Sequence, residues 1–459
     1  MSRYVAYPAY KDSGVEWLGD VPGHWTVERL NDIASIKQSN VDKKSLSNQD
    51  EVLLCNYVDV YYNSKITTNL NFMKATASEE EIKKFQLQRD DVIITKDSES
   101  PDDIGIAALV IENVESLLCG YHLAIIRDAD KLINGGYLYY ALSSRPSCHQ
   151  FLLAAKGVTR FGLSHSNIKN IQLALPKIQE QQQIAHFLDD KTAHLDKLIG
   201  QKQQMIGLLH EKRMALITQA VTKGLDLTVP MKDSGVEWLG DVPEHWTVER
   251  LNDIASIKQS NVDKKSLANQ DEVQLCNYVD VYYNSKITAN LNFMKATASE
   301  DEIKKFQLQK NDVIITKDSE SPDDIGIATL VTENIDNLLC GYHLAIIRDM
   351  DNLINGGYLY YALSSPPSSH QFLLAAKGVT RFGLSHNNIK NIQIALPKIS
   401  EQQQIISYLD LETQKIDAMI TTVKQAIVTL QEYRTALITA AVTGKIDVRG
   451  LTPADHTEG

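Results

Sequence analysis

Residues 175–223, LPKIQEQQQIAHFLDDKTAHLDKLIGQKQQMIGLLHEKRMALITQAVTK, are the stretch around which the rest of the chain is organised. Apolar residues recur in it at alternating spacings of three and four, which predicts a helix with one apolar seam. The seam positions are Ile184, Leu188, Leu195, Leu198, Met205, Leu209 and Leu216, with lysines 191, 202 and 212 interrupting the same face. About forty residues without proline predict a rod of about 60 Å, at ~1.5 Å per residue.

A second stretch of the same kind, residues 397–445, lies near the other end of the chain. Its predicted seam is Ile405, Leu409, Ile416, Met419, Val423, Leu430 and Leu437. Each long helix follows a segment with the mixed composition of a globular domain, so we interpret the two helices as spacers.

The sequence of the globular segment occurs twice in the chain. KDSGVEWLGDVP begins at Lys11 and again at Lys232, an offset of 221 residues (232 minus 11), and the copies then align without a gap to Leu175 and Leu396. About nine positions in ten are identical, and a period this long indicates a domain duplication. The differences cluster only at 111–116 against 332–337, which predicts a surface loop. The helices keep their seams while most other positions differ, so we expect two modules that do the same job and two helices that fit each other.

These boundaries predict five segments: globular modules at 1–175 and 225–396, spacer helices at 176–224 and 397–445, and a tail at 446–459. Inside a module, β-branched stretches at 53–62, 91–97, 104–111 and 121–128 predict strands. Residues 75–88 predict a short helix with Ser78 as N-cap. Residues 135–157 predict one helix that ends at a C-cap glycine, Gly157. The fold class expected is α+β.

Bulk composition limits the function classes. The 459 residues carry a formal net charge of -12, which argues against an indiscriminate binder of polyanions but permits a DNA reader with its cations on one face. No apolar run approaches the ~20 residues of a membrane span, and the first residues lack the form of a signal peptide, so we expect a cytoplasmic protein. Five isolated cysteines without a C-x-x-C pair predict reduced, mostly buried thiols.

Catalytic motifs are missing from the sequence. It contains no P-loop, no glycine-rich loop for a dinucleotide or S-adenosylmethionine, and no Asn/Asp-Pro-Pro-aromatic tetrad of an amino-methyltransferase. A nuclease motif built from 101–102 and 189–191 has far too long a spacing, and the second copy lacks the acidic-x-Lys pattern. No carboxylate–histidine spacing predicts a zinc site. The chain is therefore expected to recognise a ligand without a catalytic centre, metal or cofactor of its own.

Two polar segments of each module suit base edges and phosphates. The first spans 37–45 and is otherwise a solvated loop; its candidate DNA-binding residues are Lys37, Asn40, Lys43 and Lys44, copied at Lys258, Asn261, Lys264 and Lys265. The second is VYYNSKIT at 60–67, where paired tyrosines in a strand can equally be half core and half surface. Its candidates are Tyr62, Asn63 and Lys65, copied at Tyr283, Asn284 and Lys286.

Two further segments are also candidates. The first is the acidic loop 95–105, which would repel a phosphate unless its lysine points toward the phosphate and its carboxylates point elsewhere. Its aspartate can accept a hydrogen bond from a cytosine amino group. The candidates are Lys96 and Asp97, copied at Lys317 and Asp318. The segment 156–177 is the best candidate for a phosphate clamp, and we expect it near the joint between module and helix. Its candidates are Arg160, Ser164 and His165, copied at Arg381, Ser385 and His386, with a structural histidine as the alternative.

The motifs together resemble the specificity subunit of type I restriction–modification systems. The resemblance rests on the opening motif DSGVEWLGDVPxHW (12–25 and 233–246), on GVTRFGLSHSNIKNIQLALPKIQEQQQIAHFLD at 157–189, and on LITAAVTGKID at 437–447. The run P-x-x-x-E-Q-Q-Q-I occurs twice, at 176–184 and 397–405. The resemblance covers essentially the whole chain in the order of that family: recognition domain, helix, recognition domain, helix.

The resemblance implies that each module is a target recognition domain reading one half of a bipartite DNA site. It implies that the two helices pair as an antiparallel coiled coil with pseudo two-fold symmetry, and that this coil sets the gap between the half-sites. It also implies two modification subunits that supply S-adenosylmethionine and adenine N6 methylation. Restriction subunits would add ATP- and Mg²⁺-dependent translocation and cleavage.

One departure from that family is informative. Its recognition domains usually differ from each other, whereas these two are nearly identical, so we expect an interrupted palindrome as the target. A competing hypothesis is a scaffold whose modules bind proteins, which the acidic net charge slightly favours. The two hypotheses differ in the charge that they require on each module. A positive face formed by Lys37, Lys43, Lys44, Lys96 and Arg160 would favour DNA recognition over the scaffold. A self-contained methyltransferase or nuclease lacks motifs.

Overall fold

The computed structural model describes residues 4–44 and 46–451. The chain forms two compact units, one of Met1–Gln203 with Lys424–Gly459 and one of Gln204–Val423. Each unit therefore contains one globular module and one half of each long helix. Both modules are mixed α and β, which confirms the expected α+β class.

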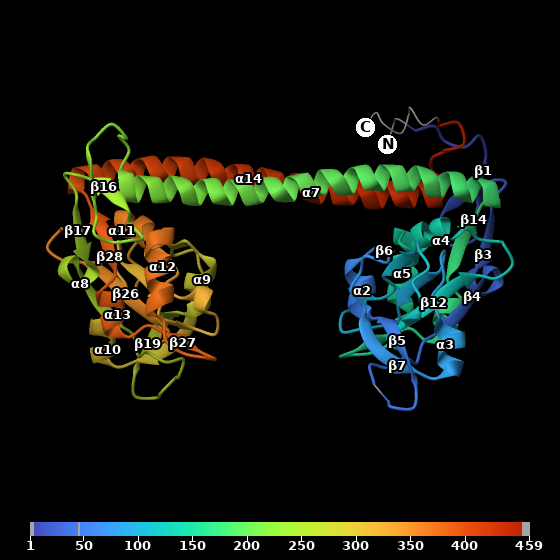
Figure 1. Ribbon diagram of the computed structural model, residues 1–459, viewed down its shortest axis with the longest axis horizontal. Helices are drawn as coiled ribbons and strands as arrows, with labels where there is room; N and C mark the ends of the chain where they lie inside the picture. Colours follow the sequence, from blue (N-terminus) through green and yellow to red (C-terminus); the bar gives the residue numbers. More distant parts are fainter. Residues whose placement is uncertain (1–3, 45, 452–459) are drawn as a thin grey trace. The chain divides into compact units, whose positions relative to one another are not determined.

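A five-stranded mixed sheet and a three-stranded sheet form the body of module 1 (Figure 1). The five-stranded sheet has the order β4 (Ala34–Gln38), β12 (Leu123–Asp128), β8 (Val92–Thr95), β10 (Ala107–Val110), β6 (Lys65–Ile66). The three-stranded sheet has the order β11 (Leu117–Cys119), β5 (Asp50–Cys55), β7 (Met73–Ala77). Three two-stranded pairs complete the module: β1 (Tyr10–Asp12) with β2 (Asp20–Pro22), β13 (Phe161–Gly162) with β9 (Asp97–Ser98), and β14 (Gln172–Leu175) with β3 (Thr26–Arg29).

Module 2 repeats this topology strand for strand. Its five-stranded sheet is β18 (Ala255–Gln259), β26 (Leu344–Asp349), β22 (Val313–Thr316), β24 (Ala328–Val331), β20 (Lys286–Ile287), and its three-stranded sheet is β21 (Met294–Ala298), β19 (Asp271–Cys276), β25 (Leu338–Cys340). The pairs are β15 (Met231–Asp233) with β16 (Asp241–Pro243), β17 (Thr247–Arg250) with β28 (Gln393–Leu396), and β23 (Asp318–Ser319) with β27 (Phe382–Gly383).

The five-stranded sheet is buried on both faces because alternate residues of its central strands enter different cores. Val92 and Ile94 of β8 join the core under the helices of the module. Ile93, between them, joins the core shared with the three-stranded sheet. This period of two follows from the pleat of a strand. It explains why the predicted strands at 91–97 and 121–128 read as continuous apolar runs.

Short helices cover the sheets. Module 1 contains α1 (Leu30–Ile33), α2 (Tyr57–Tyr62), α3 (Glu79–Phe85), α4 (Gly135–Leu142), α5 (Arg145–Ala154), α6 (His165–Lys169) and a 3₁₀ turn at Pro101–Asp103. Module 2 contains α8 (Leu251–Ile254), α9 (Tyr278–Tyr283), α10 (Glu300–Phe306), α11 (Gly356–Leu363), α12 (Pro366–Ala375), α13 (His386–Lys390) and a 3₁₀ turn at Pro322–Asp324. The predicted N-cap Ser78 is confirmed: its hydroxyl accepts from the Glu81 backbone, and the Glu81 side chain returns to the N-cap backbone.

Two local predictions are wrong. Residues 57–62 are helical and not a strand, because Asn56 and Asp59 form a capping box that begins α2. Residues 135–157 form two helices and not one. The break falls at Ser143–Ser144, where Pro146 occupies the first turn of α5, and α5 ends at the C-cap Ala155 and not at Gly157.

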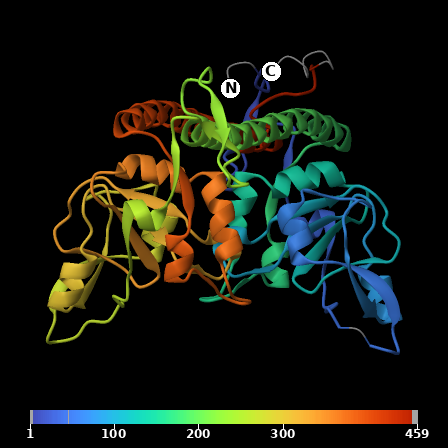
Figure 2. The same cartoon turned by 60° about the vertical axis from the view of Figure 1, so that its left-hand side comes forward.

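The long helices are α7 (Ile178–Lys223) and α14 (Ile399–Val442), and they run antiparallel within each unit. In unit 1, Arg434 Nε of α14 lies 2.9 Å from Asp196 Oδ1 of α7. In unit 2, Arg213 Nε of α7 lies 3.6 Å from Asp417 Oδ1 of α14. Asp196 and Asp417 are equivalent positions of the two helices, as are Arg213 and Arg434, because each pair differs by 221. The same aspartate–arginine contact therefore occurs twice, once with the aspartate on α7 and once with it on α14. Figure 2 shows the two helices side by side from a second direction.

Most of the predicted seam is confirmed. Ile184, Leu188, Ile405, Leu409 and Ile416 are almost fully buried. Met205 and Met419 are 42% and 47% exposed, so their assignment to the seam is wrong. Leu209, another predicted seam residue, is buried and packs with Ile416 and Ile420 in a small core of unit 2. The helix period of 3.6 drifts against a strict alternation of three and four, which moves some seam positions to the surface.

The motif P-x-x-x-E-Q-Q-Q-I forms the joint between each module and its helix. Glu180 accepts hydrogen bonds from Tyr7 Oη (2.7 Å) and Trp25 Nε1 (3.1 Å). Gln181, with no exposed surface, accepts from the Asn134 backbone N–H and donates to two carbonyls, Leu132 O and Pro176 O. In unit 2, Glu401 and Gln402 make the equivalent bonds to Trp246 and to the Asn355 backbone. The joint thus satisfies buried polar groups of the module with side chains of the first helical turn.

Replacement of Gln181 with Ala should lower the free energy of unfolding by about 1–3 kcal/mol, because backbone groups of the module lose their buried partners. Urea unfolding followed by circular dichroism measures this loss. The adjacent Gln182 is exposed, so Gln182→Ala serves as the matched control and should change stability by less than about 0.5 kcal/mol. Equal effects of the two variants would contradict the role assigned to Gln181.

Replacement of Ile416 with Ala should destabilise the helix pair of unit 2 by about 2–5 kcal/mol, since it opens a cavity in a small core. Met419→Ala, on the exposed side of the same helix, is the control and should be nearly neutral. The measurement is again the midpoint of urea unfolding. A neutral Ile416→Ala variant would show that the helices are held together elsewhere.

Candidate nucleic-acid interface

Three segments that are distant in the sequence meet where β8 ends. The Lys96 backbone N–H donates to His122 O (2.9 Å), and the Leu163 backbone N–H donates to Lys96 O (2.8 Å). Antiparallel pairing of β9 with β13 places Asp97 opposite Gly162. The end of β8, the turn before β12 and the loop before β13 therefore present their side chains to one surface. We call this surface the 97–122 face, and its copy in module 2 the 318–343 face.

Asp97 is the centre of the 97–122 face. Its Oδ2 lies 2.9 Å from Lys96 Nζ and 3.3 Å from His122 Nδ1. The Lys96 ammonium also lies 4.6 Å from the centre of the Tyr121 ring, within the range of a cation–π interaction. The carboxylate is 26% exposed and the imidazole 31%, so both can meet a ligand.

The same residues take a different arrangement in module 2. His343 Nδ1 lies 2.5 Å from Asp318 Oδ1, and Arg381 Nη2 lies 3.5 Å from the same oxygen. Lys317 leaves the carboxylate and donates to the carbonyl of Ser260 (3.0 Å), where burial lowers its pKa. One carboxylate can therefore hold a histidine together with either a lysine or an arginine. The cations of this face can exchange partners without a change in the backbone.

A small cavity of about 60 Å³ lies beside the histidine in both modules. Eight equivalent residues line each copy: Val41, Asp42, Lys43, Asn56, Tyr57, Val58, Tyr121 and His122 in module 1, and Val262, Asp263, Lys264, Asn277, Tyr278, Val279, Tyr342 and His343 in module 2. The cavity brings Lys43, from the first polar segment, next to the histidine of the face. The Lys43 backbone N–H donates to Asp42 and lowers the pKa of that carboxyl, which keeps it ionised.

The loop 157–160 projects from the same face. The backbones of Lys156 and Gly162 exchange two hydrogen bonds that close the loop. Gly157 has a φ of +148°, and a Cβ added there would lie 1.9 Å from the carbonyl oxygen of Arg160, so only glycine fits. Arg160 is exposed on this loop. The expected position near the joint is wrong: β14 carries the chain from this end of the module back to the long helix, and Figure 1 shows the equivalent β27 remote from α14.

The remaining residues predicted from the first polar segment lie close to this face. Asn40, Lys43 and Lys44 are exposed, as are their copies Asn261, Lys264 and Lys265. Lys37 and Lys258 are half-buried on the edge strands β4 and β18. The structure thus brings together candidates from three of the four polar segments.

The second polar segment lies elsewhere. Lys65 forms an ion pair with Asp189 of α7 (3.0 Å), and Lys286 approaches Asp410 of α14 (3.5 Å). Asn63 ends α2 by donating to the Asp59 carbonyl, as Asn284 does to Asp280. Tyr62 and Tyr283 are 78% and 77% exposed. The two lysines thus contact the long helices, and Tyr62 and Asn63 line a groove beside them in unit 1.

Ser164 and His165 begin α6. Ser164 accepts from the Asn167 backbone in a capping box, and Ser385 does the same in module 2. Partial burial, with a contribution from Lys169, lowers the pKa of His165, and Lys390 has the same effect on His386. The geometry therefore gives these serines a structural role in helix capping.

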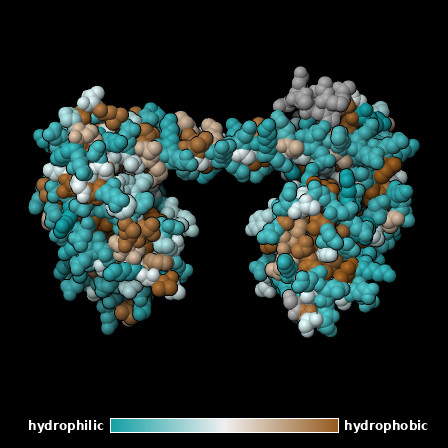
Figure 3. Space-filling model, in the orientation of Figure 1, coloured by the Kyte–Doolittle hydropathy of each residue, from teal (hydrophilic) through white to brown (hydrophobic). Residues whose placement is uncertain are grey.

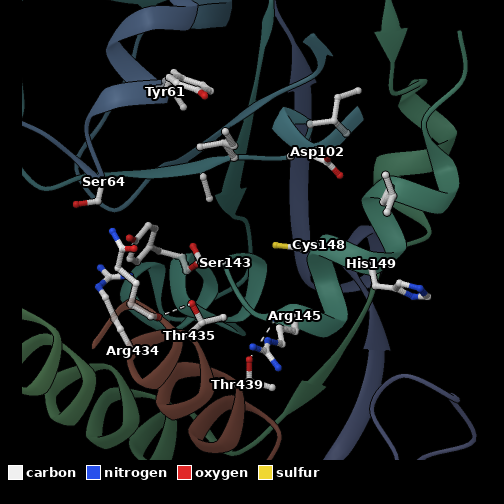
Figure 4. A pocket seen from close by; sticks show the side chains of 18 of the residues that line it. Tyr61, Ser64, Asp102, Ser143, Arg145, Cys148, His149, Arg434, Thr435 and Thr439 are labelled. Atoms are coloured by element: carbon white, nitrogen blue, oxygen red, sulfur yellow. Dashed lines mark hydrogen bonds between the residues drawn. The ribbon is translucent and has the colours of Figure 1, made fainter. Parts of the chain in front are cut away.

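A larger groove of about 1200 Å³ lies in unit 1 between module 1 and the paired helices. Figure 4 shows Arg434, Thr435 and Thr439 of α14 near Ser143, which ends α4, and near Arg145, Cys148 and His149 of α5. The Arg145 backbone N–H donates to Thr439 Oγ1 (3.2 Å). In the second copy, Pro366 and Ser369 replace Arg145 and Cys148, so this groove lacks the duplication of the 97–122 face.

Apolar side chains are also exposed on the modules. In Figure 3 apolar surface gathers over α12 of module 2 and at the corresponding place on module 1. Leu373, Leu374 and Val379 contribute exposed surface there, as Leu152, Leu153 and Val158 do in module 1. Four of the five cysteines are buried, as predicted for most of them, and Cys148 is exposed; none of the five forms a disulfide.

Within residues 4–44 and 46–451, no group of three or more metal-ligating side chains comes together. No helix in that part of the chain is long and apolar enough to cross a membrane.

The family model described as "Type I restriction modification DNA specificity domain" matches residues 22–207 and 243–428. This chain belongs to that family. The two matches begin at the ends of β2 and β16 and extend into the long helices, so each module together with part of its helix contains one DNA specificity domain.

Relatives and a solved structure cover nearly the whole chain. The putative type I restriction enzyme MjaX specificity subunit of Methanocaldococcus jannaschii is 23% identical over 449 residues, which are 94% of this chain and 96% of that protein. The EcoKI specificity subunit of Escherichia coli strain K12 is 21% identical over 93% of this chain and 90% of its own. A chain from a structure of the type I R-M system, described in terms of complex assembly and conformational transition, has a TM-score of 0.64 at 16% identity over 93% of this chain and 99% of that chain. This last similarity shows the fold.

Sequence reasoning missed several residues of the 97–122 face in this DNA specificity domain. The strand predicted at 121–128 includes Tyr121 and His122, whereas these residues form the turn that leads into β12. Asn56 and Tyr57 were assigned to a strand as well, and they begin α2. The available signal was the glycine before Tyr121, which separates two apolar runs and is typical of a turn.

Proposed function

We propose that this chain is the DNA-recognition subunit of a type I restriction–modification complex, in which each DNA specificity domain reads one half of a bipartite site. The observation that carries this proposal is the repetition of one polar face in two domains of the matched family. Each face combines exposed lysines, an arginine, a carboxylate and an imidazole, which are the groups used for phosphates and base edges.

The target follows from the duplication. The residues of the 97–122 face are the same as those of the 318–343 face, so both domains should read the same bases. Contacts between the long helices recur with the helices exchanged, as in the Asp196–Arg434 and Asp417–Arg213 pairs. Such reciprocal contacts are typical of an isologous two-fold interface. We therefore propose an interrupted palindrome, with the same half-site on opposite strands and a gap set by the paired helices.

Catalysis belongs to partner subunits in this proposal. Two modification subunits would bring S-adenosylmethionine and methylate adenine N6, and restriction subunits would bring ATP and Mg²⁺ for translocation and cleavage. The chain itself is proposed to be non-catalytic, in keeping with its lack of a P-loop and of a methyltransferase motif. A complex that acts on cellular DNA with these cofactors is proposed to work in the cytoplasm.

Partner subunits are proposed to dock on the paired helices and the surfaces beside them. The groove of unit 1 that contains Arg434 and Arg145 is one such surface, because it is formed jointly by a module and both helices. It lies apart from the 97–122 face, so a partner can bind there without covering the side chains proposed to read DNA.

The phosphate contacts can be tested through salt dependence. Replacement of Lys43, Lys44, Lys264 and Lys265 with Ala should weaken binding to all duplexes and reduce the slope of log K against log salt by about 0.9 for each lysine that contacts a phosphate. Fluorescence anisotropy of the assembled methyltransferase complex with a labelled duplex measures the slope. As a control, Lys11, Lys177, Lys232 and Lys398 are four exposed lysines outside the proposed face, and their replacement should leave the slope unchanged.

Adenine-methylation mapping tests the proposed function and the palindrome together. DNA from cells that express this chain with its modification subunit should carry one interrupted palindromic motif, and DNA from cells without this chain should carry none. Two unrelated half-sites would keep the recognition function and reject the palindrome. An absence of methylation with an assembled and active partner would favour the scaffold hypothesis.

A further inference from the structure

We propose that His122 and His343 are specificity-determining residues, each of which accepts a hydrogen bond from the exocyclic amino group of an adenine or cytosine placed in the adjacent 60 Å³ cavity. The inference rests on the proposed function and deepens it, because it names the residue and the base chemistry that each domain reads.

The carboxylate of the face fixes which nitrogen of the imidazole is available. Asp97 Oδ2 lies 3.3 Å from His122 Nδ1, and Asp318 Oδ1 lies 2.5 Å from His343 Nδ1. An ionised carboxylate only accepts, so the proton of the neutral ring resides on Nδ1. Nε2 is then left as an acceptor. In module 2 it lies 3.4 Å from Arg381 Nη2, so this arginine has to leave His343 before a base can use the acceptor. Asp97 thereby acts as a positioning residue, and the imidazole presents one acceptor to DNA.

The size of the cavity selects a substituent and not a whole base. A volume of about 60 Å³ is well below the ~300–1,000 Å³ of pockets that enclose a whole small-molecule ligand. Tyr57 and Tyr121 form part of its wall. The edge of a stacked base can therefore enter the cavity, while a flipped base cannot.

The polar lining favours a donor from DNA. Asp42 lies on the cavity with an ionised carboxylate, and His122 adds the Nε2 acceptor. Among base edges in the major groove, only the N6 amino group of adenine and the N4 amino group of cytosine donate hydrogen bonds. The keto oxygens O6 of guanine and O4 of thymine would meet two acceptors. Lys43 also lines the cavity, and guanine bound to this lysine is the competing outcome of the test.

The cations around the histidine are placed for the backbone. Lys96 lies 2.9 Å from Asp97, and Arg381 in module 2 lies 3.5 Å from Asp318. Since the two modules show different cations on the same carboxylate, either cation can leave it for a phosphate. The histidine keeps its contact with the carboxylate in both modules.

The duplication supplies an internal control for the test. His122→Ala alters one domain and leaves the other unchanged, so methylation mapping should show relaxed specificity at one position of one half-site only. His343→Ala should relax the same position in the other half-site, and the double variant should relax both. Cognate binding should fall about 10-fold for each domain, the size expected for the loss of one base contact, while binding to an unrelated duplex should stay the same.

Base analogues identify the group that is read. Each adenine of one half-site is replaced in turn by purine, and each cytosine by 2-pyrimidinone, which lack the exocyclic amino group. At one position the analogue should weaken binding of the unaltered complex about 10-fold and have no further effect on the His122→Ala complex. Additive losses at every position would overturn the proposal. A loss shared with Lys43→Ala at a guanine replaced by 7-deazaguanine would overturn it in favour of the lysine.

Asp97→Asn tests the positioning role and separates it from a purely structural one. The variant keeps the shape of the carboxyl group but lets the imidazole change its tautomer, so it should relax the same position as His122→Ala. A fall in thermal stability with an unchanged methylation motif would assign Asp97 a structural role and contradict the proposal. Failure of the unaltered complex to bind or methylate any site would reject the proposed function itself, a result distinct from all of these.

Discussion

The pairing of the two long helices is the interaction on which each unit depends, and it begins at the buried joint that fixes each helix to its module. Glu180 and Gln181 of the first turn of α7 satisfy an indole N–H, backbone carbonyls and a backbone N–H of module 1. Unsatisfied, those groups would cost about 1–3 kcal/mol each. Because polar bonds are directional, the joint fixes the direction in which the helix leaves the module, which an apolar contact alone would not do.

The polar face and the joint lie at different ends of a module. The residues that form the polar face are therefore separate from those that hold the long helix. After the loop that contains Arg160, the chain passes through β13 and α6, and β14 then leads to the first turn of α7. Side chains on the 97–122 face can therefore change without any effect on the helix contacts. The differences between the copies are consistent with this division, since the modules are nearly identical while the two helices differ at many more of their positions. The helices keep the residues of the joint and the ion-pairing residues Asp196 and Arg213, copied at Asp417 and Arg434.

Acidic net charge and DNA recognition are compatible in this chain because charge is distributed locally. The formal charge of -12 is spread over two modules and two helices, whereas the exposed lysines of residues 43–44 and 264–265 gather beside the carboxylates of the polar faces. Aspartates on such a face reduce non-specific attraction to phosphates, and here they contact the Nδ1 atoms of His122 and His343. Weak binding to non-target DNA increases the ratio of specific to non-specific affinity, which a sequence-recognition subunit requires.

The sequence alone determined the duplication, the long helices and the family resemblance, because these depend on repeats and periodicities that are local or exact. It also predicted the N-cap Ser78, since a capping box is a contact within four residues. It was wrong about 57–62 and 135–157, where β-branched or helix-forming composition competed with caps at Asn56 and a proline at 146. Only the tertiary structure brought Lys96, Asp97 and His122 together and separated them from Lys65, which binds α7. The physical reason is that strand pairing joins segments far apart in the chain, and their register depends on the packing of both faces of the sheet.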